Sequence, residues 1–184
     1  MKPFHSCYLL LPLSFVQAGS SHTFLSSKRA EKVSSCADIS TPTTFSLSQI
    51  SYIKIEQYPT MATVPNSTQL VFEVVNNANS ISTGCSPQNV EVNGQWGNDS
   101  NYWYKCIDRN LEVNGDEVTL STSAHVVWEQ WQLSVNQSWS CGDESIVRHI
   151  STTTLKPSCQ ETSSAFQYIN ECTAPDLEAP AAFQ

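Results

Sequence analysis

Apolar and polar residues alternate along the stretch 128–141, which reads WEQWQLSVNQSWSC. At the two-residue period of a β-strand, one face holds Trp131, Leu133, Val135, Trp139 and Cys141. The other face is polar. This arrangement is typical of an antiparallel strand with one face on a core and the other in water. We therefore predict that residues 128–141 form the central strand of a β-sheet.

The same alternation predicts strands earlier in the chain. The stretch 45–58 has a bulge or break near Gln49, and its apolar face holds Phe45, Leu47, Ile53 and Ile55. The stretch 69–75 turns an apolar face inward, made of Leu70, Phe72 and Val74. The sequence NNANS that follows is rich in residues that favour turns. We predict a strand at each stretch and a turn after the second.

Turn residues and short apolar runs indicate several more strands. Asn114 and Gly115 form a strong hairpin signal between the stretches 111–113 and 117–121. Further strands are predicted at 101–106, 146–155 and 165–172. No stretch of useful length has helical periodicity, which leaves about seven to ten short strands. This pattern favours an all-β fold, an antiparallel β-barrel or sandwich that forms a single disulfide-stapled domain.

Residues 1–18 have the features of a secretory signal peptide. Lys2 precedes an apolar run too short to span a membrane, and Val16 and Ala18 lie at −3 and −1 of a cleavage point. Residues 19–29 end in a Lys–Arg pair, which is either the end of a propeptide or an ordinary charge pair. We expect a secreted, extracellular chain with a β domain at residues 30–172 and a disordered acidic, Pro- and Ala-containing tail at residues 173–184.

The charge balance excludes two classes of partner. The chain has 9 Lys and Arg residues against 17 Asp and Glu residues, a net charge of −8. Removing residues 1–29 takes away Lys2, Lys28 and Arg29 and no acidic residue, so the remaining chain has a net charge of −11. An acidic surface repels phosphate backbones and anionic lipid headgroups. We therefore expect neither nucleic acid nor a membrane as partner, whereas a cationic protein is permitted.

The cysteines predict three disulfides. Seven occur, and Cys7 leaves with the signal peptide, so six remain: Cys36, Cys85, Cys106, Cys141, Cys159 and Cys172. An even number in a secreted chain indicates disulfides, although fifteen pairings are open from the sequence alone. Neither His125 nor His149 stands at zinc-finger spacing from a cysteine. We therefore expect no metal site and no cofactor.

Two aromatic segments resemble a known family. The segment NYWYKC at 101–106 precedes LSVNQSWSC at 133–141, and Cys85, Trp128 and Cys159 stand before, between and after them. Their order and spacing resemble the Alternaria major-allergen-like family of small secreted fungal proteins, over roughly Phe45 to Cys159. The resemblance implies a β-barrel-like fold and a fungal extracellular setting. It also implies, for some members, binding of plant defence proteins, and it supplies no catalytic residues.

The resemblance further implies disulfides between sequence neighbours. Two cysteines then remain to join the ends of the domain, so the implied pairs are Cys85–Cys106, Cys141–Cys159 and Cys36–Cys172. The allergen of this family uses an amino-terminal cysteine to link two chains. A monomer and a disulfide-linked dimer through Cys36 therefore both stay open.

Five tryptophans in a small domain raise the hypothesis of a carbohydrate ligand, because flat aromatic faces stack on the apolar faces of sugar rings. We expect Trp131 and Trp139 in the core, since they lie on the apolar face of the predicted central strand. The candidate ligand-facing residues are Trp96, Trp103 and Trp128, although the pattern favours core or partly covered packing over a ligand-facing role.

Three glycosylation sequons begin at Asn66, Asn98 and Asn136. Each lies in a predicted loop or on a polar strand face, where an attached glycan would reach solvent. We expect at least one of them to be used in a secreted chain.

No catalytic motif accompanies the acid–base residues. His125, Asp108, Asp116 and Glu117 occur without a nucleophile elbow, a phosphate loop or a metal-ligand pattern. We expect a non-enzymatic secreted protein, effector-like or allergen-like, that binds an extracellular protein from a host or a second copy of itself. The alternative is a secreted carbohydrate-binding or carbohydrate-active protein that uses exposed Trp together with Asp or Glu.

Overall fold

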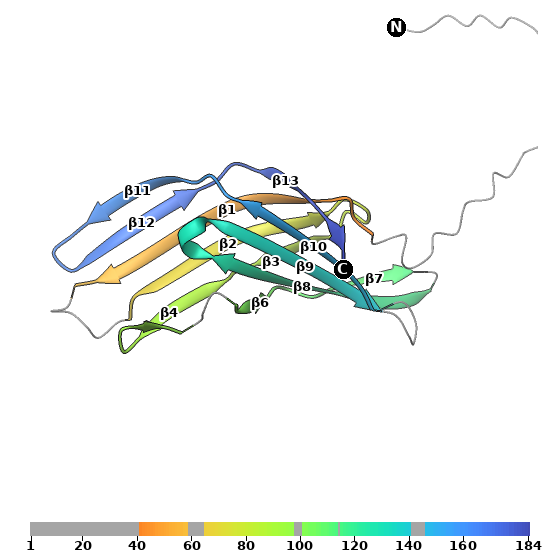
Figure 1. The fold of residues 1–184 in the computed structure, drawn as a ribbon, viewed down its shortest axis with the longest axis horizontal. Helices are drawn as coiled ribbons and strands as arrows, with labels where there is room; N and C mark the ends of the chain where they lie inside the picture. The colour runs from red at the N-terminus through yellow and green to blue at the C-terminus, as the bar shows by residue number, and fades with distance from the viewer. Residues whose placement is uncertain (1–40, 59–64, 98–100, 114, 141–145) are drawn as a thin grey trace, which may run out of the picture. The chain divides into compact units, whose positions relative to one another are not determined.

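The computed structural model describes residues 41–58, 65–97, 101–113, 115–140 and 146–184. Within these ranges the chain is almost entirely β-strand (Figure 1). The strands are β1 (Thr44–Gln57), β2 (Ser67–Asn76), β3 (Ser82–Cys85), β4 (Gln88–Val92), β5 (Gln95–Trp96), β6 (Trp103–Lys105), β7 (Arg109–Val113), β8 (Asp116–Val127), β9 (Gln132–Ser140), β10 (Ile146–Thr154), β11 (Ser158–Ser163), β12 (Gln167–Thr173), β13 (Leu177–Pro180) and β14 (Ala182–Phe183).

The strands form two antiparallel sheets. The eight-stranded sheet has the order β11-β12-β1-β2-β4-β5, with β13 also paired to β1 and β3 to β2. The six-stranded sheet has the order β14-β10-β9-β8-β6, with β7 also paired to β8. The predicted all-β antiparallel fold is confirmed. In the described part of the chain it is a sandwich of two open sheets, and neither sheet closes into a barrel.

The main core lies between the two sheets. The eight-stranded sheet contributes the inward faces of β1 and β2, and the six-stranded sheet contributes those of β8 and β9. The predicted inward residues of β2 are confirmed, because their exposed fractions are 2% or less for Leu70, Phe72 and Val74. Each such side chain stabilises the fold by about 1.5–3 kcal/mol relative to full exposure.

The predicted bulge in β1 is present, and it changes which residues face the core. The register with β2 slips by one residue before Ser51, where Gln49 adopts a φ of 53°. The inserted residue reverses the alternation, so Ile50 is 4% exposed and Tyr52 packs against the core. The prediction that Ile53 and Ile55 share the inward face is therefore wrong, since that face continues from Phe45 and Leu47.

The predicted central strand is shorter than residues 128–141. β9 begins at Gln132, and Cys141 lies outside the described residues. Residues Trp128–Gln130 form one 3-10 turn, η2, and Trp131 follows in the left-handed region at a φ of 53°. The face of β9 that was expected in water is also largely covered: Ser134 is 7% exposed, and its hydroxyl is hydrogen-bonded to that of Thr152 at 2.8 Å.

The remaining predicted strands are present, and the structure adds strands outside the predicted stretches. β7 and β8 form the expected hairpin, in which Val113 pairs with Asp116 and Gly115 has a φ of 90°. β10 and β12 correspond to the stretches 146–155 and 165–172, whereas only residues 103–105 of the aromatic stretch are strand. The strand β11 was not predicted, because its sequence SCQETS has no apolar alternation and every residue is exposed.

The disulfides confirm one implied pair and correct the other two. Cys85 is bonded to Cys106, as expected. Cys159 is bonded to Cys172, so the pairs Cys141–Cys159 and Cys36–Cys172 are both wrong. The register of the β11–β12 hairpin places Cys159 directly opposite Cys172, with 4.0 Å between their Cα atoms, and this neighbour relation could not be inferred while β11 was unrecognised. Cys36 and Cys141 lie outside the described residues.

The expected disordered tail at residues 173–184 is instead ordered strand. β13 pairs with β1 over Leu177–Pro180, and β14 pairs with β10 over Ala182–Phe183. Ala179 is 1% exposed and belongs to the main core. The small alanine side chains lack a visible apolar pattern, but they allow this segment to pack closely over the sheets.

The expected signal peptide and propeptide at residues 1–29 lie outside the described residues. Within the described ranges, no helix has both the length and the apolar character needed to cross a membrane.

Candidate functional site

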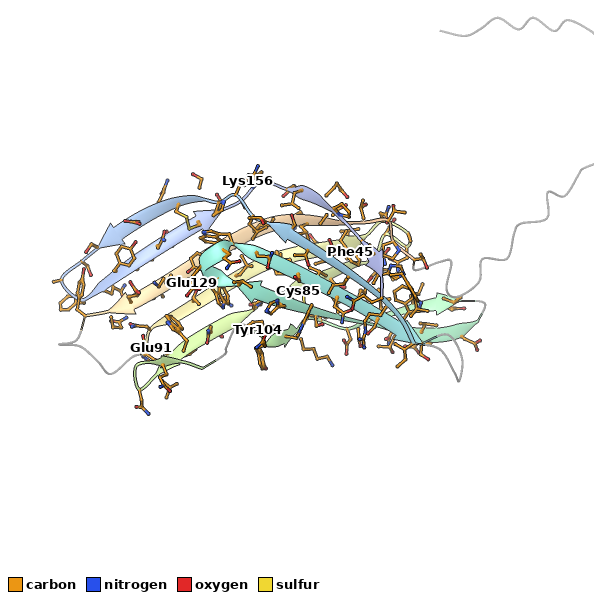
Figure 2. The ribbon with its side chains drawn as sticks, in the orientation of Figure 1. Phe45, Cys85, Glu91, Tyr104, Glu129 and Lys156 are labelled. Carbon is orange, nitrogen blue, oxygen red and sulfur yellow. A yellow bond between two sulfur atoms is a disulfide. The ribbon has the colours of Figure 1, made fainter. Side chains whose placement is uncertain are left out.

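A pocket of about 340 Å³ opens between the two sheets beside the η2 turn. One wall comes from β1, β2, β4, β5 and β12 of the eight-stranded sheet, and the other comes from the end of β8 and from η2. The lining residues are Tyr52, Lys54, Thr68, Asn89, Trp96, Val126, Val127, Trp128, Glu129 and Asn170. We call this site the aromatic pocket. Figure 2 shows Glu129 on the η2 turn, beside the strands of the larger sheet.

The aromatic rings of this pocket are held by one another. The ring of Tyr52 lies 6.1 Å from that of Trp128 and 4.8 Å from that of Trp131, in an edge-to-face arrangement with the latter. Trp128 also meets Tyr104 edge to face, at 6.3 Å between ring centroids. Trp96, on the short strand β5, is 39% exposed and forms the open side of the pocket. The pocket therefore has one fixed and one accessible aromatic wall.

The polar lining combines neutral and charged groups. Asn89 and Thr68 are 3% and 5% exposed, and the Thr68 hydroxyl lies beside the Tyr52 phenol. Burial raises the pKa of the Tyr52 phenol, an effect that the nearby Thr68 hydroxyl and Lys54 ammonium partly oppose. Lys54 forms an ion pair with Glu56 at 2.6 Å. Among the described lining residues, Glu129 supplies the only carboxylate.

A second candidate site is the exposed stretch around β6. Tyr102, Trp103 and Ile107 are 48%, 39% and 55% exposed, and we call these three residues the β6 surface. The charged residues Lys105 and Asp108 lie among them and form an ion pair at 2.7 Å. β6 pairs only with β8 in the described chain, so it is an edge of the six-stranded sheet.

The β6 surface is anchored from both sheets. The disulfide of Cys106 with Cys85 joins it to β3, and the backbone N–H of Ile107 donates to the carbonyl of Gly84 at 3.1 Å. The Trp103 ring lies 5.3 Å from His125 on the neighbouring strand. The exposed side chains therefore project from a rigid backbone.

The structure separates the three candidate ligand-facing tryptophans. Trp96 and Trp128 line the aromatic pocket together, whereas Trp103 belongs to the β6 surface. Of the two tryptophans expected in the core, Trp139 is 3% exposed and Trp131 is only partly buried against Tyr52. The sequence interpretation missed the pocket residues Tyr52, Lys54 and Thr68.

Two of the three sequons can be placed. The side-chain nitrogen of Asn66 donates to Glu91 at 2.6 Å, and its oxygen accepts the backbone N–H of Gln57 at 2.6 Å. Asn136 is half-buried, with its side-chain nitrogen 3.5 Å from the Ser123 hydroxyl, so it lies on a less open face than predicted. Asn98 lies outside the described residues.

The comparison of the fold with solved structures finds one likeness of note. The structure is similar to the crystal structure of the Alternaria alternata allergen Alt a 1, with a TM-score of 0.45 and 13% sequence identity, over 78% of this chain and 90% of that chain. This likeness concerns the fold alone. No protein-family model and no curated protein sequence matches the chain.

Proposed function

We propose that this chain is an extracellular, non-enzymatic protein, allergen-like or effector-like, that binds another protein through the β6 surface. The observation that supports this proposal is the exposure of Tyr102, Trp103 and Ile107 within six residues of chain. Single exposed apolar side chains are common, whereas a group of them indicates an interaction site, and tyrosine and tryptophan are prominent among the residues that dominate protein–protein binding energies.

The anchoring of this surface also favours recognition. Because the Cys85–Cys106 disulfide and the Ile107 backbone hydrogen bond already fix the stretch, a partner would immobilise little further chain on binding. The net charge of −8 favours a basic partner, since complementary charge accelerates association. The two disulfides fit a chain that folds in an oxidising compartment, as secreted proteins do.

The carbohydrate alternative has support of its own in the aromatic pocket, where Trp96 and Trp128 meet. Its hydrolytic version is less well supported. Glycoside hydrolysis uses a pair of carboxylates about 5–10 Å apart, whereas Glu129 is the one carboxylate among the described lining residues.

The test is a pull-down from plant apoplastic fluid with the oxidised, secreted protein. We expect a basic protein to be captured, and Trp103→Ala to weaken its affinity by at least about tenfold. Trp96→Ala is the matched control, because Trp96 has the same exposed fraction of 39% and lies outside the β6 surface. Capture of no partner, together with release of sugar from wall polysaccharide, contradicts the proposal.

A further inference from the structure

We infer that the aromatic pocket is a binding site for a neutral saccharide, independent of the β6 surface. The inference rests on three features of the described residues: two tryptophans in one pocket, buried neutral polar side chains beside them, and a single lining carboxylate with no unpaired lining cation. It takes up the carbohydrate alternative in its non-hydrolytic form and does not depend on a protein partner.

The size and composition of the pocket suit a small polar ligand. Its volume of about 340 Å³ lies within the range of about 300–1,000 Å³ that is usual for small-molecule sites. Such sites combine apolar walls with a few polar groups that orient the ligand. Here Trp96, Trp128 and Tyr52 supply the walls, and Thr68, Asn89 and Asn170 supply neutral polar groups.

The two tryptophans have different roles in this arrangement. Trp128 is fixed between Tyr52 and Tyr104, so its ring is in place before a ligand arrives. Trp96 stands on the two-residue strand β5, which pairs with β4, and its 39% exposed ring remains accessible to a ligand. A pyranose ring presents an apolar face of C–H groups, which suits a flat aromatic wall, and a polar rim of hydroxyls.

The polar groups favour hydroxyls over charged ligand groups. Thr68 is 5% exposed, and its hydroxyl stands beside the Tyr52 phenol, whose pKa it lowers, so the two oxygens retain further capacity to donate and accept hydrogen bonds. Lys54 is neutralised by Glu56 at 2.6 Å, and Glu129 is exposed on the η2 turn. An anionic ligand would therefore meet no unpaired cation among the described lining residues, whereas sugar hydroxyls can both donate and accept hydrogen bonds.

The backbone that presents Trp128 is unusual in a way that is consistent with a site. η2 ends at Trp131 in the left-handed region, with a φ of 53°, which a bulky residue rarely adopts. This conformation reverses the chain between β8 and β9 and leaves Trp128 and Glu129 at the mouth of the pocket.

The experiment is calorimetric titration of the full secreted protein with soluble neutral oligosaccharides of β-1,3-glucan, chitin, xylan and mannan. We expect saturable binding of at least one of them. Trp96→Ala should weaken that binding by at least about tenfold, and Thr68→Val, which keeps the side-chain shape and removes the hydroxyl, by about fivefold. Trp103→Ala, with the same exposure as Trp96, should leave it unchanged.

Three outcomes overturn the inference. They are no saturable binding of any of these oligosaccharides, equal weakening by Trp96→Ala and Trp103→Ala, and tighter binding of a charged uronic-acid oligosaccharide than of every neutral one. Thermal unfolding of each variant shows whether it is folded. If Trp96→Ala is unfolded, Thr68→Val decides. Because partner capture depends on Trp103 and saccharide binding on Trp96, either proposal can fail while the other stands.

Discussion

The side-chain nitrogen of Asn76 donates a hydrogen bond to the side-chain oxygen of Gln137 at 2.7 Å, and both residues are 0% exposed between the two sheets. Gln137 in turn donates to the hydroxyl of Thr122 at 3.1 Å. Asn76 ends β2 in one sheet, and Gln137 lies in β9 of the other. The contact is thus a polar link through the interior of the sandwich, where an amide without a partner is unfavourable by about 1–3 kcal/mol.

We predict that Gln137→Ala lowers the free energy of unfolding by about 2–4 kcal/mol, because it removes a buried hydrogen bond between the two sheets and opens a cavity. The measurement is urea denaturation of the oxidised protein. In a double-mutant cycle with Asn76→Ala, the combined loss should be smaller than the sum of the single losses. The control is Asn79→Ala, which removes the turn hydrogen bond from the backbone N–H of Ile81 but no contact between the two sheets. Strict additivity of Gln137→Ala and Asn76→Ala would refute the link.

A buried histidine should make the stability depend on pH. His149 is 3% exposed, and its ring stacks on Trp139 at 5.6 Å and meets Phe183 at 5.5 Å. Burial lowers the pKa of His149 below its ordinary value of 6.5. The unfolded chain therefore binds a proton that the folded chain resists as the pH falls below about 6.5. Stability from this group is complete above that pH and decreases towards the lower folded-state pKa.

The variant His149→Phe keeps an aromatic ring beside Trp139 and removes the titration. We predict that its free energy of unfolding falls less steeply with decreasing pH below 6.5 than that of the natural chain. The difference between the two curves isolates the histidine from the carboxylates, and each unit by which the pKa is lowered accounts for about 1.4 kcal/mol. Parallel curves between pH 7 and pH 4 would exclude this account.

The two disulfides should differ in what they stabilise. The chain-entropy effect of closing loops of 21 and 13 residues is similar, about 3 kcal/mol each. Cys85 and Cys106 are buried and link β3 to the end of β6, so replacing both by serine should lower the melting temperature of the whole domain. Cys159 lies on β11, which is exposed along its whole length. Replacing Cys159 and Cys172 by serine should therefore loosen β11 first, through local opening.

Limited proteolysis and hydrogen exchange distinguish these two outcomes. Cleavage near residues 158–163 at a temperature where the rest of the domain is protected is the expected result for Cys159→Ser with Cys172→Ser. Uniform loss of protection in that variant would show that the β11–β12 disulfide stabilises the domain globally. The variant without Cys85 and Cys106 is the comparison.

A tyrosine at the surface of β12 has an altered pKa. A hydrogen bond with the Glu161 carboxylate on β11, together with burial and the negative charges of Glu161 and Glu56, raises the pKa of Tyr168 to about 12. We predict that Glu161→Gln shifts this pKa back towards the ordinary value of 10.0. Tyrosinate absorbance during an alkaline titration measures the shift. Glu171→Gln, on the same strand as Tyr168, should leave it unchanged, and an equal shift in both variants would contradict the assignment.

Alternation along the chain predicts the strands well where one face is apolar and fails where it is not. The strand 69–75 and the hairpin at Asn114 and Gly115 follow from side-chain period and turn chemistry, which are local properties. β11 has neither signal, because it is exposed on both faces and is held by its partner strand and a disulfide. The tail is ordered for a similar reason, since it is held by backbone pairing with β1 and β10, for which its own sequence carries no signal.

The aromatic pocket was only partly predictable for a different reason. Trp96 and Trp128 are suspected from their residue type, but their meeting depends on the packing of the two sheets. Tyr52 faces the pocket because the inserted residue at Gln49 reverses the alternation of β1. A bulge was expected there, but its effect on the later residues depends on how many residues it inserts.

Near the end of the chain, β13 pairs with β1 and, two residues later, β14 pairs with β10. One short peptide therefore forms hydrogen bonds with both sheets of the sandwich. Removal of a few residues by an exopeptidase would break the pairing of β14 with β10 and expose His149, whose ring contacts Phe183. An affinity handle for any of these measurements therefore belongs on the amino-terminal side of the β domain, after the predicted cleavage points, where it leaves the pairing of β13 and β14 intact.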